Sequence, residues 1–115
     1  MLEKYPSELE MLETFGTEPL EAAQEDGFWQ YSFCDTEYTQ VLFSFNIFES
    51  SVQTIVKYKS RTVSIVSFEG DGVLRIDRRN GYPIIDGDFQ QSEYKTRLII
   101  HIEPLVEVKW STMKR

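Results

Sequence analysis

Apolar and polar residues alternate with a period of two after Gly27. In the first run Trp29, Tyr31 and Phe33 alternate with polar or smaller residues, and residues 41–48 repeat the pattern. Successive side chains of a β-strand point to opposite faces, so this alternation predicts strands with one buried face. An amphipathic helix would need apolar residues three or four positions apart. The pattern therefore predicts that most of the chain forms β-sheet.

The predicted strands follow one another through short connections. Further β-rich runs cover residues 52–58, 62–68 and 73–79, with only three or four residues between neighbouring runs. A parallel crossover needs a dozen or more residues, so connections this short favour antiparallel neighbours. We therefore expect a β-meander.

The last third of the chain is less regular. Residues 80–93 carry several Asn, Gly, Pro and Asp turn signals, so we expect an irregular stretch with at most a short edge strand at 82–85. Residues 94–102 and 105–110 resume the strand pattern. A twisted sheet of about seven strands tends to curl, which predicts a strongly curved sheet or an open barrel.

The first 26 residues are predicted to form two short helices. Ser7 and Glu10 have the spacing of a capping box, and Gly16 ends the first helix. Thr17 caps the second helix and Gly27 ends it. The apolar side of the first helix consists of Leu9, Met11, Leu12 and Phe15.

The second predicted helix is strongly acidic. Glu18, Glu21 and Glu25 stand at positions i, i+3 and i+7, which places them on one helix face. Together these patterns predict an α+β fold in a single domain over residues 1–115, with an acidic helical segment at 1–26 and a mainly antiparallel sheet at 27–115.

The formal net charge of −7 belongs to the beginning of the chain. Residues 1–26 hold eight acids and one base, whereas the other eleven acids are balanced by eleven bases. A negative segment repels a phosphate backbone, so we expect no direct binding of nucleic acid. A basic protein partner would instead be attracted.

The sequence offers no set of residues for catalysis or metal binding. Cys34 and His101 are the only cysteine and histidine, and neither stands in a nucleophile or zinc-ligand pattern. We expect Cys34 to be a packed thiol and His101 a solvent-facing strand residue. A non-enzymatic protein without metal or cofactor is predicted. A lone cysteine, with no leader pattern or long apolar run, predicts a cytoplasmic location away from membranes.

Carboxylates and one aromatic residue are the predicted partner-binding surface. The acids of the first segment lie near the acidic loop at 35–38, which adds a tyrosine. An acidic rim around an aromatic anchor suits a basic partner. The predicted binding residues are Glu10, Glu13, Glu18, Glu21, Glu25, Asp26, Asp35, Glu37 and Tyr38.

Two other functions fit parts of the sequence. A curved sheet with an apolar pocket lined by Trp29, Phe43 and Phe45 would bind a small ligand. A nuclease of the PD-(D/E)xK type would hold Mg²⁺ with carboxylates and use a lysine to orient water. The residues that loosely match that pattern are Pro83, Asp86, Glu107, Val108 and Lys109.

The segments GFWQYSF at 27–33 and VLFSFNI at 41–47, in a small acidic chain with helices before a β-meander, give the chain a family resemblance. It resembles the immunity proteins of polymorphic bacterial toxin systems, including those of contact-dependent growth inhibition. The resemblance implies a cytoplasmic protein that binds the C-terminal toxin domain of a cognate effector. It further implies that the toxin is often a nuclease, whose basic active-site cleft the acidic surface would block.

Overall fold

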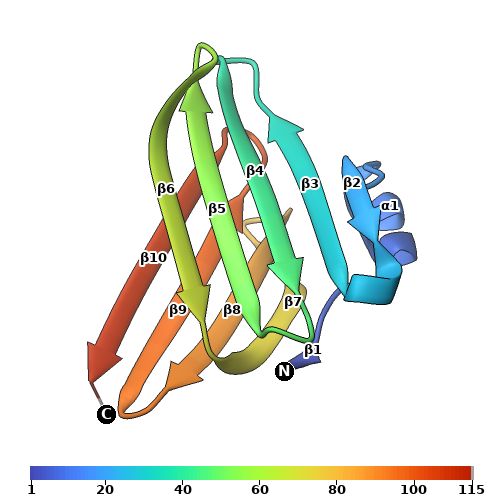
Figure 1. The fold of residues 1–115 in the computed structure, drawn as a ribbon. Coiled ribbons are helices and arrows are strands. Elements are labelled where there is room, and N and C mark those ends of the chain that lie inside the picture. Colours follow the sequence, from blue (N-terminus) through green and yellow to red (C-terminus); the bar gives the residue numbers. More distant parts are fainter. Residues whose placement is uncertain (115) are drawn as a thin grey trace.

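The computed structural model describes residues 1–114, and strands dominate it (Figure 1). The elements in chain order are β1 (Leu2–Lys4), α1 (Glu8–Phe15), β2 (Glu21–Ala23), the 3₁₀ helix η1 (Gln24–Asp26), β3 (Phe28–Cys34), β4 (Thr39–Asn46), β5 (Ser51–Tyr58), β6 (Arg61–Glu69), β7 (Asp71–Arg79), β8 (Tyr82–Gln91), β9 (Tyr94–His101) and β10 (Glu107–Lys114).

The strands form two five-stranded sheets that lie face to face (Figure 1). The first sheet has the order β2-β3-β4-β5-β6, and its strands pair antiparallel. The second has the order β1-β7-β8-β9-β10, in which only β1 pairs parallel. Each sheet is therefore a four-stranded meander with one short strand added at its edge. The chain passes from the first sheet to the second at Gly70, between β6 and β7.

Inward-facing side chains of both sheets form one hydrophobic core. Tyr31, Phe43 and Phe45 of the first sheet are at most 1% exposed, and Leu74 and Ile100 of the second are fully buried. The alternation of the sequence thus puts its aromatic residues between the sheets. Helix α1 adds Met11 and Phe15 to this core.

The prediction of two N-terminal helices followed by about seven strands is wrong. Only α1 is an α-helix among residues 1–114, and ten strands lie in two sheets, not in one curved sheet or open barrel. In place of the second helix, β2 extends the first sheet: Glu21 lies opposite Gln30, and the Leu20 N–H donates to the Gln30 carbonyl at 2.7 Å. Pairing with β3 overrides the local helix propensity of this segment, because propensity is weak relative to tertiary contacts.

The first predicted helix is correct, including its ends. The Ser7 side chain accepts from the Glu10 N–H and the Glu10 side chain accepts from the Ser7 N–H, each at 3.1 Å, which completes the capping box. Gly16 ends the helix in the left-handed conformation, with φ of 65°. Local hydrogen bonds alone specify both ends.

The irregular stretch predicted at 80–93 is instead the long central strand β8 of the second sheet. The sequence Asp86-Gly87-Asp88 has the composition of a turn, but both carboxylates lie among arginines of neighbouring strands. Gly87 serves packing, because a Cβ there would lie 2.6 Å from the Phe89 ring and 3.0 Å from Leu74. Cross-strand contacts that a local pattern does not contain therefore determine this strand.

No helix within residues 1–114 has the length and apolar composition that crossing a membrane requires.

The Tyr31 hydroxyl is buried without a hydrogen-bond partner among residues 1–114. Burial raises the pKa of Tyr31 to about 12, and the nearby Glu8 carboxylate adds to the shift. A buried hydroxyl without a partner costs about 1–3 kcal/mol. We therefore expect Tyr31→Phe to raise the free energy of unfolding in urea by about 1 kcal/mol. A lower free energy of unfolding would mean that the hydroxyl bonds to water.

Candidate partner-binding surface

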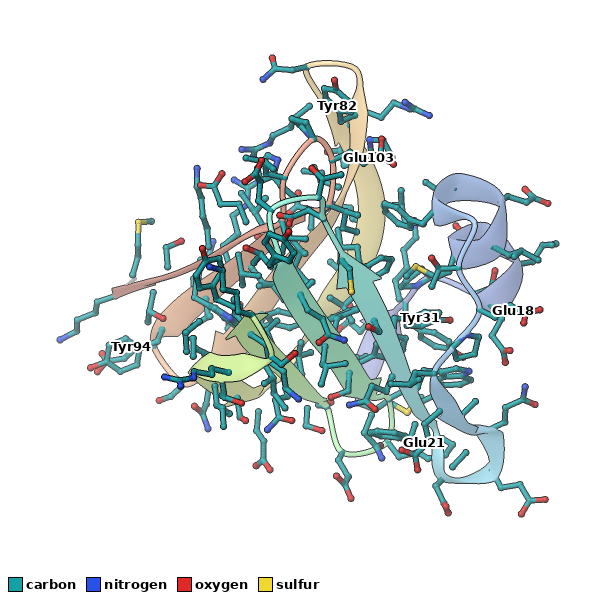
Figure 2. The ribbon with its side chains drawn as sticks, turned by 90° about the horizontal axis from the view of Figure 1, so that it is seen from above. Glu18, Glu21, Tyr31, Tyr82, Tyr94 and Glu103 are labelled. Carbon is teal, nitrogen blue, oxygen red and sulfur yellow. The ribbon has the colours of Figure 1, made fainter. Side chains whose placement is uncertain are left out.

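The nine predicted binding residues fall into two groups. The first follows the open edge of the first sheet along β3, because Phe15 at the end of α1 packs on Phe33 with ring centroids 5.4 Å apart and Ala23 of β2 lies opposite Phe28. The second, Asp35, Glu37 and Tyr38, belongs to the turn that follows β3. The larger group lies on α1, the following loop, β2 and η1, and Figure 2 shows Glu18 and Glu21 on the same side of the molecule. We call this group the acidic flank: Glu10, Glu13, Glu18, Glu21, Glu25 and Asp26.

The carboxylates of the acidic flank are exposed and carry uncompensated charge. All six residues are exposed, and none forms an ion pair with a lysine or arginine of residues 1–114. The ion pairs among residues 1–114 lie on the second sheet or at its edges, where they involve Arg75, Arg97, Lys109, Lys114 and the N-terminal amine. The excess negative charge of the sequence therefore remains available on one side of the protein.

Glu18, Glu21 and Glu25 do not form the predicted helical stripe. Glu18 is in the loop after α1, Glu21 is in the edge strand β2 and Glu25 is in η1. The three residues still belong to one continuous segment along the open edge of the first sheet. The three carboxylates are therefore exposed on one surface, although they do not lie on one face of a helix.

Three hydrogen bonds join α1 and this segment to each other and to the first sheet. The half-buried Glu8 carboxylate accepts from the Trp29 indole N–H at 3.0 Å and from the Gln24 side-chain amide. The Asn46 side-chain amide donates to the Asp26 carbonyl at 3.1 Å. Because α1, η1 and β3 are tied together, the acidic flank is a preorganised surface.

Exposed leucines lie among these carboxylates, and the sequence pattern did not predict them. Leu9 and Leu20 are each 63% exposed and Leu12 is 43% exposed, whereas Met11 is fully buried. Leu9 and Leu12, with Glu18 nearby, line an open groove of about 490 Å³. Their spacing of three residues is the missed signal, because it places both on one side of the helix, away from the side that buries Met11.

Asp35 in the second group has a structural role. Its Oδ1 accepts from the N–H groups of Glu37 at 2.8 Å and Thr39 at 3.0 Å, and its Oδ2 accepts from the Val106 N–H at 2.8 Å. Desolvation alone would raise the pKa of Asp35, but these three backbone donors together hold it below its usual value. The carboxylate therefore joins the β3–β4 turn to the segment before β10.

Glu37 and Tyr38 form the exposed tip of the same turn. Tyr38 is 69% exposed and has a φ of 65°. The Lys59 amine lies 5.9 Å from the centre of its ring and 5.5 Å from that of Tyr58. This tip therefore pairs an aromatic residue with a cation and is distinct from the acidic flank.

Asp35→Ala is expected to lower the free energy of unfolding by about 1–2 kcal/mol at pH 7, because it removes three hydrogen bonds to a charged acceptor. A lowered carboxyl pKa stabilises the fold above the unfolded value of about 4, and this stabilisation disappears as the pH falls through the folded pKa. The difference from the wild-type protein should therefore shrink below about pH 4. Urea unfolding at several pH values measures it. Glu37→Ala is the control, and an equal loss there would contradict the role of Asp35.

The aromatic residues predicted to line a ligand pocket fill the core instead. Phe43 and Phe45 are buried with ring centroids 5.5 Å apart, and the Trp29 ring stacks on Phe45 at 5.6 Å. Their contacts leave the inner side of the sheet packed. These three residues therefore do not line the apolar pocket that the small-ligand hypothesis requires.

The residues of the nuclease pattern do not converge. Asp86 accepts from Arg97 at 3.1 and 3.2 Å and lies 3.7 Å from Arg75, so arginines occupy its carboxylate. Glu107 and Lys109 pair with each other at 3.3 Å on β10, two strands away from Asp86. Within residues 1–114, no group of three carboxylate, histidine or cysteine side chains is arranged to hold a metal ion.

The prediction for the single cysteine is wrong. Cys34 is exposed at the end of β3, because its position in the alternation places it on the outer face of the first sheet. His101 is the last residue of β9, half-buried between Ile84 and Glu107 on the neighbouring strands.

A solved structure shares this fold over almost its whole length. It is described as a contact-dependent growth inhibition toxin–immunity protein complex from Klebsiella pneumoniae 342, and its matching chain has a TM-score of 0.83 and 25% sequence identity. The resemblance to contact-dependent growth inhibition immunity systems is confirmed. The match covers 96% of this chain and 97% of the other, so the two share the complete fold. No family model and no curated protein matches the sequence.

Proposed function

We propose that this protein is a cytoplasmic immunity protein of contact-dependent growth inhibition, which binds and neutralises the C-terminal toxin domain of a cognate effector. The observation that carries the proposal is the full-length structural match to a chain of a toxin–immunity complex. The role is one of binding, and it requires no catalytic group in this chain.

We further propose that the acidic flank docks on the toxin and covers a basic active-site cleft, as expected for a nuclease. Six carboxylates without internal ion pairs supply the negative potential. Such a potential speeds the encounter with a basic protein. The exposed Leu9, Leu12 and Leu20 supply apolar contacts, which would govern the dissociation rate.

Co-expression tests the immunity role. The toxin domain encoded next to this gene should stop growth when expressed alone, and this protein should restore growth and co-purify with the toxin. An unrelated immunity protein is the control for specificity. Failure to restore growth, with both proteins present at normal levels, would refute the proposal.

Purified proteins test the nuclease part separately. The toxin domain should cleave RNA or DNA, and an equimolar amount of this protein should stop the cleavage. If growth is rescued but the toxin has no nuclease activity, immunity stands and the proposed class of toxin is wrong.

A further inference from the structure

A groove with apolar walls and two carboxylates lies between α1 and the loop that follows it. Its lining consists of Glu8, Leu9, Leu12, Glu18 and Pro19, and its volume is about 490 Å³. Both leucines are exposed, and Figure 2 shows Glu18 beside α1. No lysine or arginine of residues 1–114 lines the groove, so its carboxylates meet no positive charge there. The groove therefore adds a concave site to the acidic flank.

Glu8 is held in a fixed position and keeps one free oxygen. Its Oε2 accepts from the Trp29 indole N–H at 3.0 Å and from the Gln24 side-chain amide. Within residues 1–114 its Oε1 accepts no hydrogen bond, and the carboxylate forms no ion pair. The carboxylate is half-buried and has lost part of its hydration, a loss that a bound cation would compensate. Because two neutral donors already orient it, little freedom is lost when a cation binds.

Glu18 supplies the second carboxylate from the loop after α1. It is exposed and has no ion pair among residues 1–114. The rest of the lining beside the two acids is hydrocarbon, from Leu9, Leu12 and Pro19. This combination suits a group that is positively charged at its edge and apolar on its faces or along its stem.

We infer that this groove binds an arginine side chain of the toxin, an inference that rests on the proposed function. The arginine packs its stem on the two leucines, and its guanidinium donates to Glu18 and to Oε1 of Glu8. A guanidinium is planar and weakly hydrated and carries five donors, so it can contact apolar walls and two carboxylates at once.

The other kinds of side chain fit the groove less well. An apolar side chain would bury Glu8 and Glu18 further without giving either carboxylate a partner, which costs free energy. A lysine amine is a compact and strongly hydrated point charge, so it gains less from apolar walls and cannot present paired donors. The charge and the walls together therefore select arginine.

Glu18→Gln tests the groove, and Glu13→Gln is the matched control. Both residues are exposed members of the acidic flank without ion pairs among residues 1–114, but only Glu18 lines the groove. Glu18→Gln should accelerate dissociation from the toxin domain about tenfold in surface plasmon resonance, because the guanidinium loses a charged acceptor. Glu13→Gln should change the dissociation rate less than about twofold. Glu8→Gln, which keeps an oxygen acceptor for the Trp29 N–H, should also accelerate dissociation.

A double-mutant cycle identifies the residue that enters the groove. Each surface arginine and lysine of the toxin domain is replaced by alanine, and the binding of each variant to the wild-type protein and to Glu18→Gln is compared. One arginine should lose about tenfold in affinity for the wild-type protein, and its loss should cancel the effect of Glu18→Gln. Replacing that arginine with lysine should still weaken binding about fivefold, because the paired donors are lost.

Equal effects of Glu18→Gln and Glu13→Gln would overturn the inference, as would coupling of Glu18 to a lysine or to no cationic residue of the toxin. In these outcomes the wild-type protein still binds the toxin and restores growth, so the immunity role stands. If the wild-type protein binds no toxin, the proposed function fails and the inference falls with it.

Discussion

Replacing Glu18, Glu21 and Glu25 together with lysine is expected to slow association with the toxin domain about ten- to a hundredfold at low salt. The three changes take the formal net charge from −7 to −1 and reverse the potential of the acidic flank. All three residues are exposed and without ion pairs, so the fold should remain intact. Stopped-flow mixing at several salt concentrations measures the rate, and the difference should narrow as salt screens the charges.

A second triple variant separates local charge from total charge. Glu69, Asp77 and Glu103 are also exposed and without ion pairs, and their replacement by lysine gives the same net charge of −1. Because these residues lie outside the acidic flank, association should slow much less. Equal slowing in both variants would show that only net charge matters, and unchanged rates in the first would exclude the acidic flank from the encounter.

The leucines beside the acidic flank should affect the dissociation rate of the complex with the toxin. Leu9 and Leu20 are exposed and make no part of the core, so truncating them costs the fold little. Apolar contacts in an interface are lost mainly as faster dissociation, whereas surface charges set the rate of encounter. On a surface that combines carboxylates and leucines, the carboxylates would therefore set the association rate and the leucines the dissociation rate of the complex. A purely acidic surface would lack the second contribution.

The sequence predicts the first sheet well because its information is local. Strands β3 to β6 lie within a few residues of the alternating runs, and their short connections define the antiparallel order. The sequence does not predict strand β8, because its two aspartates are explained by Arg75 and Arg97 on neighbouring strands, and Gly87 is explained by the packing of Phe89 and Leu74. A local pattern of turn residues cannot reveal partners that the fold supplies.

The same difference between local information and contacts supplied by the fold applies to the candidate site. The excess charge of the first 26 residues was visible in the sequence and lies exposed on one side of the protein. The loop carrying Asp35 is close to this segment in the sequence, but backbone donors hold the Asp35 carboxylate and Tyr38 lies beside Lys59, so the loop differs in character from the acidic flank. The sequence does not predict that Leu9 and Leu12 are exposed, because apolar residues of α1 face both the core, as Met11 does, and the solvent.

Asp86→Ala is expected to lower the free energy of unfolding by about 3 kcal/mol. The Asp86 side chain is only 2% exposed and lies between Arg97, at 3.1 Å, and Arg75, at 3.7 Å. Removing the carboxylate leaves two guanidinium groups close together without their shared counter-charge. Because these arginines are 37% and 44% exposed, water compensates them in part, and the loss should fall at the lower end of the range for broken buried pairs.

Asp88→Ala provides the contrast within the same strand. Asp88 also contacts Arg75, but its side chain is 50% exposed, so its removal should cost about 1 kcal/mol or less. Urea unfolding of both variants measures the difference, and equal losses would mean that burial adds nothing to the Asp86 pairs. The acidic flank lies on the other sheet, so Asp86→Ala should leave the rate of toxin association unchanged while the protein is folded. A slower encounter with the folded variant would place part of the docking surface on the second sheet.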